Sequence, residues 1–127
     1  MPKVFFYDLG LRHQAIRNFQ PISQRPDAGA VIENCVFRIL SNHIGSGELK
    51  FWRTKNGGEV DFVFESDVLL PVEVKYSRLS TQRIPSGIRF FIQQYEPKCS
   101  VVVTKDDLGI SECNGQKVLF LPVYLLG

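Results

Sequence analysis

Two short runs between residues 58 and 75 alternate polar and apolar residues, and this pattern predicts two β-strands that form a hairpin. In the first run, strict alternation places the carboxylates of Glu59 and Asp61 on one side. The apolar residues on the other side are Val60, Phe62 and Phe64. In the second run, Glu73 and Lys75 share the face opposite Val72 and Val74. Three carboxylates and one lysine are therefore expected to meet on one face of the hairpin.

A further strand is expected just before this hairpin, which makes a three-stranded antiparallel meander. Leu49 to Thr54 reads as a strand, and Asn56-Gly57-Gly58 is a strong turn sequence because Asn and Gly accept positive φ. Ser66-Asp67 supplies the second turn. Pro71 falls within the third strand, which indicates an edge position or a bulge there, because proline has no N–H to donate.

A helix is predicted from Asp27 to about His43, because Asp is a preferred N-cap and the Gly45-Ser46-Gly47 cluster supplies a stop. Its expected buried stripe consists of Ile32, Val36, Ile39 and Leu40, with Cys35 at the edge. Glu33 lies roughly 100° from Ile32 on the helical wheel, at the border of the stripe. We therefore expect Glu33 where the helix meets the sheet, with Arg38 on the opposite face.

The second half of the chain predicts a helix followed by two strands. Ser86 is expected to cap a helix over Gly87 to Tyr95, and Cys99 to Val103 is a continuous apolar strand of the kind covered on both faces. A loop from Lys105 to Gly115 leads to a final strand, Lys117 to Leu126, interrupted at Pro122. The crossover helix would place the Cys99 strand parallel to the third meander strand. The expected fold is a mixed α/β sandwich.

The chain has 127 residues, 44% of them hydrophobic, which is enough for one folded domain with its own core. We divide it into an N-terminal strand and connector over residues 1–26 and an α/β core over residues 27–127. A formal net charge of +2 means that a basic surface requires local clustering. The odd, widely spaced cysteines argue against a disulfide scaffold and a cysteine zinc site. With neither a membrane span nor a secretory leader in the sequence, we expect a cytoplasmic protein.

The acidic hairpin face is the main candidate for chemistry. Mg²⁺ and Mn²⁺ prefer carboxylate, carbonyl and water oxygens, and Asp61 and Glu73 on neighbouring strands can reach one such ion. Lys75 can orient a metal-bound water or stabilise the charge that develops on phosphorus. Glu33 can reach the metal from the helix directly or through water. The alternative is a cross-strand charge ladder without function.

Basic residues near this face are candidates for contact with phosphates, which gives affinity without sequence selectivity. They are Arg53, Lys55, Arg78 and Arg83. The alternative is a solvated basic rim. Trp52 can stack on an unpaired base or simply cover the sheet.

The order of Glu33, Asp61 and Glu73-Val74-Lys75 on helix, strand and strand resembles the PD-(D/E)XK, or restriction-endonuclease-like, nuclease superfamily. More closely, the chain resembles a nuclease-like domain found C-terminal to AAA-type ATPase domains in many bacterial and archaeal proteins. The segments that carry this resemblance cover nearly the whole chain. They include Phe6 to Leu11, Gly29 to Asn34, Phe51 to Lys55, Glu59 to Val63, Pro71 to Lys75, Gly87 to Thr104 and Leu121 to Tyr124.

The resemblance implies a restriction-endonuclease-like sandwich with a central mixed sheet, the antiparallel meander plus a parallel strand, flanked by helices. It also implies Asp61 and Glu73 as metal ligands, Lys75 as the catalytic lysine and Glu33 as an auxiliary acid. Val60 stands where the motif has proline. No GxxxxGK[ST] is present, so an ATPase partner would lie elsewhere or in a longer chain.

Two functions remain from the sequence. The first is a Mg²⁺- or Mn²⁺-dependent nuclease that hydrolyses DNA phosphodiesters. The second is an inactive nuclease-like module that binds nucleic acid or protein and serves an AAA-type ATPase, with an oligomer as a further possibility. The complete set of acids and lysine favours the first function, and the near-neutral net charge favours the second.

Overall fold

The computed structural model describes residues 27–42, 48–56, 58–76 and 83–126. The predicted N-terminal strand and connector, the Gly45-Ser46-Gly47 stop and Arg78 lie outside these residues. The described elements follow the order α2 (Ala28–Asn42), β1 (Glu48–Arg53), β2 (Glu59–Glu65), β3 (Leu69–Lys75), α3 (Ser86–Tyr95), β4 (Cys99–Thr104), β5 (Gly109–Cys113), β6 (Gln116–Pro122) and a 3₁₀ turn η2 (Val123–Leu125). No described helix has the length and apolar character needed to cross a membrane.

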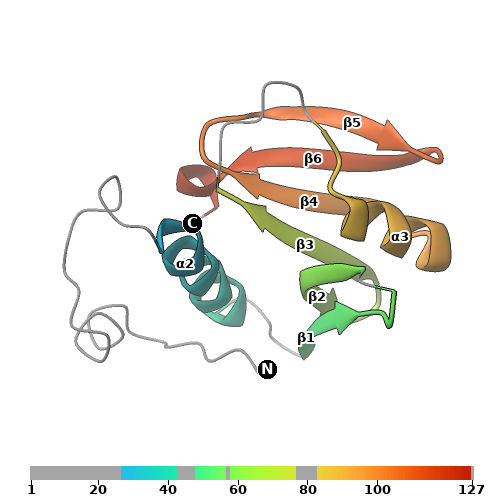
Figure 1. Cartoon of the computed structure of the whole chain (residues 1–127), viewed down its shortest axis with the longest axis horizontal. Coiled ribbons are helices and arrows are strands. Elements are labelled where there is room, and N and C mark those ends of the chain that lie inside the picture. The colour runs from blue at the N-terminus through green and yellow to red at the C-terminus, as the bar shows by residue number, and fades with distance from the viewer. Residues whose placement is uncertain (1–26, 43–47, 57, 77–82, 127) are drawn as a thin grey trace.

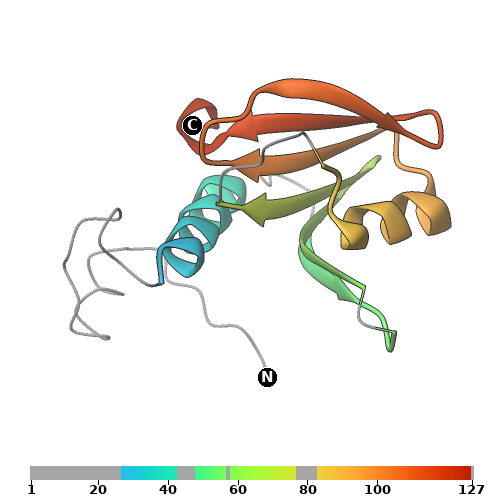
Figure 2. The ribbon, with the colours of Figure 1, turned by 45° about the horizontal axis from the view of Figure 1, so that its top comes forward.

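The strands form one mixed sheet of six strands in the order β1-β2-β3-β4-β6-β5 (Figure 1). The predicted meander is confirmed, since β1 with β2 and β2 with β3 are antiparallel pairs. The predicted crossover is also confirmed, because α3 leads from β3 to β4 and the two strands run parallel. β6 adds a second parallel pair on the far side of β4. In Figure 2 the β1–β2 end of the sheet turns away from the β5–β6 end.

Each face of the sheet packs against one described helix. On one face, Ile88, Phe91 and Ile92 of α3 share a buried cluster with residues of β2, β4 and β6. On the other face, Ile32 and Val36 of α2 share a cluster with residues of β2, β3 and β4. This two-sided cover explains why β4 reads as a continuous apolar run.

The stripe predicted on α2 is broader than the sequence pattern suggested. Val31 and Asn34 are buried together with Ile32 and Val36, whereas Ile39 and Leu40 are only half-buried. Asn34 is a buried polar residue that the apolar pattern did not select, and its exposed fraction is 1%. Arg38 is exposed, as predicted.

The strict alternation predicted for β2 is wrong at its centre. Lys50 of β1 pairs with Val63, and Trp52 pairs with Val60, so two residues of β2 lie opposite the single residue between Lys50 and Trp52. Those two residues are Asp61 and Phe62, and they form a β-bulge. As a result, Val60 packs on the α3 face while Phe62 packs on the α2 face. The bulge changes the direction of the Asp61 side chain relative to a regular strand.

Pro71 lies in the interior of the sheet, on β3 between β2 and β4, and not on an edge strand. On its β4 side, however, Pro71 has no paired residue, as on an edge strand. Pro71 pairs with Val63 on the β2 side, but the pairing of β3 with β4 begins one residue later, at Val72 and Val101. The missing N–H of proline therefore falls before the parallel ladder starts.

Two predictions in the second half of the chain need correction. The expected loop from Lys105 to Gly115 contains a strand, β5, which pairs with β6 through a tight turn at Asn114 and Gly115, both with positive φ. That dipeptide is a strong hairpin sequence. Ser86 is the first residue of α3 and not its cap, because Pro85 occupies the N-cap position and no side chain caps the helix.

Candidate metal and phosphodiester site

The candidate site lies where β2 and β3 separate. Their pairing ends at Phe62 and Val72, so the next two residues, Asp61 and Glu73, are not joined by strand hydrogen bonds. Each strand instead donates a backbone N–H to a carboxylate of the other. The Asp61 N–H donates to Glu73 Oε1 at 3.2 Å, and the Val74 N–H donates to Asp61 Oδ2 at 2.8 Å. The backbone thus fixes both carboxylates side by side.

The electrostatics of this pair are unfavourable for two free negative charges. Asp61 and Glu73 are 9% and 5% exposed. Burial, followed by the neighbouring Asp61 carboxylate, raises the pKa of Glu73 from its ordinary 4.5 to about 9, against the opposing effects of Lys75 and the Asp61 N–H. The pair requires either a shared proton or a cation to balance its charge. That requirement is typical of a metal-binding carboxylate pair.

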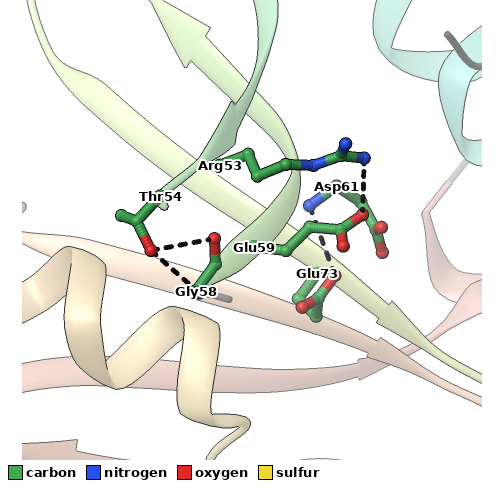
Figure 3. A network of polar contacts seen from close by, with 6 residues as sticks. All are labelled: Arg53, Thr54, Gly58, Glu59, Asp61 and Glu73. Atoms are coloured by element: carbon green, nitrogen blue, oxygen red, sulfur yellow. Dashed lines mark hydrogen bonds and ion pairs between the residues drawn. The ribbon is translucent and has the colours of Figure 1, made fainter. Parts of the chain in front are cut away.

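All four predicted site residues line one cleft of about 510 Å³. Glu33 reaches it from α2, Asp61 from the bulge of β2, and Glu73 and Lys75 from the end of β3. Glu59 lies on the same cleft, and Figure 3 shows its side chain close to those of Asp61 and Glu73. Because β2 and β3 separate here, helices from both faces of the sheet contribute to the cleft. The four residues predicted for the site therefore lie together in one cleft.

The donor set fits a hard divalent cation, since it consists of carboxylate oxygens near backbone groups and solvent. Asp61 and Glu73 form the core of that set. Within the described part of the chain, no three His, Cys, Asp or Glu side chains are grouped closely enough to hold a metal ion by themselves. Glu33 lies on the cleft without completing such a group.

The N-terminus of α3 forms the opposite wall of the cleft, a feature that the sequence analysis missed. Pro85, Ser86 and Gly87 line it, and Gly87 packs directly on the backbone of β2. A Cβ on Gly87 would overlap with the carbonyl oxygen of Glu59, so only glycine allows this approach. The sequence signal for this close approach was a glycine in the first turn of an amphipathic helix.

The sequence profile of a domain of unknown function, DUF4143, matches residues 28–124. The chain belongs to the DUF4143 family. No curated protein matches the sequence.

Among solved structures, this DUF4143 chain is similar to a chain of the refined half-complex from a tetradecameric assembly of Thermococcus gammatolerans McrB AAA+ hexamers with bound McrC. The identity is 12% and the TM-score 0.58, and the match covers 74% of this chain and 27% of that chain. At this identity the similarity concerns the fold alone. The DUF4143 chain matches little more than a quarter of the length of its structural relative.

The four basic residues predicted to contact phosphates occupy different places in the DUF4143 fold. Arg53 is 3.9 Å from Glu59 Oε1 and so approaches the acidic cleft as the partner of a carboxylate. Lys55 is exposed in the β1–β2 turn. Arg83 lines a second cleft that shares Lys75 with the first. Arg78 is not among the described residues.

Trp52 has a packing role in the DUF4143 fold. Its ring makes edge contacts with Phe91 and Tyr95 of α3, at centroid distances of 5.3 and 6.3 Å. It is partly buried against the core cluster of the α3 face. Packing, which was one of the two predicted roles, is therefore observed for this residue, and base stacking stays a prediction.

Proposed function

We propose that this protein is a metal-dependent phosphodiester hydrolase of restriction-endonuclease-like fold that acts on DNA. One observation carries the proposal: two buried carboxylates, from Asp61 and Glu73, are held together by each other's backbone at a gap between strands. Burying such a pair is costly unless a shared proton or a cation balances its charge. A lysine beside the pair, in a cleft open to solvent, makes a hydrolytic site a better explanation than a structural one.

The roles follow from the positions of the side chains. Asp61 and Glu73 would hold Mg²⁺ or Mn²⁺, which when bound supplies a Lewis acid and an activated water. Lys75 is exposed in the cleft, and its charge opposes the rise in the pKa of Glu73 that burial and Asp61 cause, so it is close enough to interact with charge at the carboxylates. There it would stabilise the negative charge that develops on the attacked phosphate. Glu33 would orient water at the edge of the site.

The family-level resemblance supports the same proposal. The element order and the position of the Glu73-Val74-Lys75 segment on the third strand agree with what the PD-(D/E)XK resemblance implies. Fold similarity alone does not establish activity, however, because one fold can serve many functions. The local geometry of the carboxylates is therefore the stronger support.

The deciding experiment is cleavage of labelled single-stranded, duplex and branched DNA in the presence of Mg²⁺ or Mn²⁺. We expect the native protein to cleave at least one of these and EDTA to stop it. Lys75→Ala should lower the rate by about 10²-fold or more, as expected for loss of a group that stabilises the transition state. Lys98→Ala is the matched control, because Lys98 is exposed next to β4, at the end of that strand away from Lys75. An equal effect of both changes would contradict the assignment of Lys75.

The second candidate is a non-catalytic module that serves an AAA-type ATPase. It is favoured by the fold similarity to a chain of an assembly containing AAA+ hexamers, and by the small share of that chain that the similarity covers. This candidate predicts a folded protein that cleaves none of the three DNA substrates with either metal. It also predicts that this domain forms a stable complex with an ATPase, either co-expressed or part of a longer chain. The contact would lie on a surface outside the acidic cleft.

A further inference from the structure

A second cleft adjoins the acidic one on the side of Lys75. Its volume is about 410 Å³, and it is lined by Lys75, Arg83, Ile84, Pro85, Ser86 and Arg89. Three of these residues, Lys75, Pro85 and Ser86, also line the acidic cleft. The two clefts are therefore adjacent, with the Lys75 side chain between them. We call the second one the basic cleft.

The charge of the basic cleft is opposite to that of its neighbour. Its lining contains three cationic side chains and no carboxylate. Between described residues, ion pairs connect Lys50 and Arg53 to glutamates, and none involves the three cations of the basic cleft. These cations are exposed, so they are available to an anionic ligand.

Parts of the basic cleft are anchored to the core and to the sheet. Its floor is Ile84, which is 6% exposed and belongs to the core cluster on the α3 face. Arg89 Nη1 donates to Cys113 Sγ of β5 at 3.9 Å, which holds that guanidinium beside the sheet. No side chain caps the first turn of α3, so its N–H groups add a smaller positive contribution at the same wall.

We propose that the basic cleft binds the backbone phosphate of a DNA strand that neighbours the phosphate attacked at Asp61 and Glu73. This inference rests on the proposed hydrolase function for its placement along the strand. Arg83 and Arg89 supply the phosphate contacts, since guanidinium groups pair well with phosphate oxygens. Lys75 faces both phosphates. Arg83 is among the residues predicted from the sequence to contact phosphates, and Arg89 is not.

The test is the binding of a short, end-labelled single-stranded oligonucleotide, measured by fluorescence anisotropy in EDTA so that metal-dependent cleavage does not interfere. The double variant Arg83→Gln/Arg89→Gln should raise Kd about tenfold, because two charge-assisted contacts are lost. The slope of log K against log salt should fall by about 1.4, the value for two phosphate contacts on a single strand. Arg83→Lys/Arg89→Lys, which keeps the charge, should recover much of the affinity.

Arg38→Gln is the matched control, because Arg38 is an exposed arginine on α2, the helix that packs on the other face of the sheet. It should leave Kd and the salt slope unchanged. An equal loss in this control, or no loss in the double variant, would overturn the proposal. Comparing 5′-hydroxyl with 5′-phosphorylated oligonucleotides separates an internal phosphate, which we expect, from a terminal one.

The outcome separates this inference from the proposed function. If the native protein cleaves DNA while the double variant binds and cleaves normally, the hydrolase stands and the basic cleft is rejected. If no DNA is cleaved but binding depends on Arg83 and Arg89, the phosphate site stands and the hydrolase is rejected.

Discussion

At the scale of single residues, the energetics of the site depend on the contact between Asp61 and Glu73. The folded protein holds Glu73 with its pKa raised to about 9, whereas the unfolded chain has it at the ordinary 4.5. Between these values the folded state binds a proton that the unfolded state has lost. The stability contributed by this proton is fully present below about pH 4.5 and is lost as the pH rises toward 9.

In EDTA, the melting temperature of the native protein should therefore fall as the pH rises from 5 to 9, a window set by the raised pKa of Glu73. Asp61→Asn should weaken this dependence and raise the melting temperature at pH 7 by roughly 4–6 °C for each unit by which the pKa of Glu73 falls, because one pKa unit is worth about 1.4 kcal/mol. Glu73→Gln should abolish the dependence. Thermal melts monitored by circular dichroism across the pH range check this, and a native melting temperature that is flat or rises with pH would count against the pair.

The sequence predicted that the four candidate residues meet, and they line one cleft, but the bulge that carries Asp61 and the contribution of α3 to that cleft could not be predicted. Period-two alternation was sufficient to place Glu73 and Lys75 on one face, because β3 is regular there. The same rule failed in β2, since a bulge depends on how two strands pair and not on one strand's sequence. Arg89 was missed because it is an exposed position on a helix, and only the tertiary fold brings it beside Arg83 and Lys75.

At the scale of elements, the cleft depends on how closely α3 approaches β2. Gly87→Ala should lower the free energy of unfolding by about 2 kcal/mol or more. The added Cβ would overlap with the Glu59 carbonyl oxygen, so the helix must move. Gly29→Ala in α2 is the opposite case, since no atom lies within 4 Å of the added Cβ. Alanine there should stabilise the helix by about 0.5–1 kcal/mol. Urea unfolding of both variants measures whether Gly87→Ala lowers and Gly29→Ala raises the free energy of unfolding. A destabilised Gly29→Ala with an unaffected Gly87→Ala would refute the packing argument.

Helices and strands were predictable where the hydrophobic pattern and the turn-forming residues indicated the same element. The meander, the crossover helix and the parallel strand follow from alternation, glycine-containing turns and a continuous apolar run. β5 was missed because its exposed residue Ile110 and its polar neighbours do not alternate as a half-buried strand should. It forms because the Asn114-Gly115 turn returns the chain onto β6, which is a long-range effect from the viewpoint of β5.

At the scale of the whole molecule, a cation that binds only the folded state should stabilise it by mass action. Mn²⁺ at about 100 times its Kd should contribute about 2.7 kcal/mol, which is roughly 8–12 °C in melting temperature for a domain of this size. Asp61→Asn should lose most of this increase, whereas Glu48→Gln, a change in an exposed carboxylate at the start of β1, should keep it. A metal-dependent increase of equal size in both variants would place the ion outside the predicted site.

The candidate residues are concentrated in the β2–β3 hairpin, which bears on how the proposed activity could be lost in evolution. Asp61, Glu73 and Lys75 all belong to the segment from β2 to β3, and the hydrogen bonds that join Asp61 to Glu73 and to Val74 span only 12 and 13 positions of the chain. The strands β4, β6 and β5 pair among themselves without any of these three residues, and β4 meets the hairpin along β3, where Glu73 pairs with Val102 and Lys75 with Thr104. Under the proposed function, substitutions within one contiguous hairpin would therefore be enough to remove the hydrolytic residues while the pairing of β4, β6 and β5 stays intact.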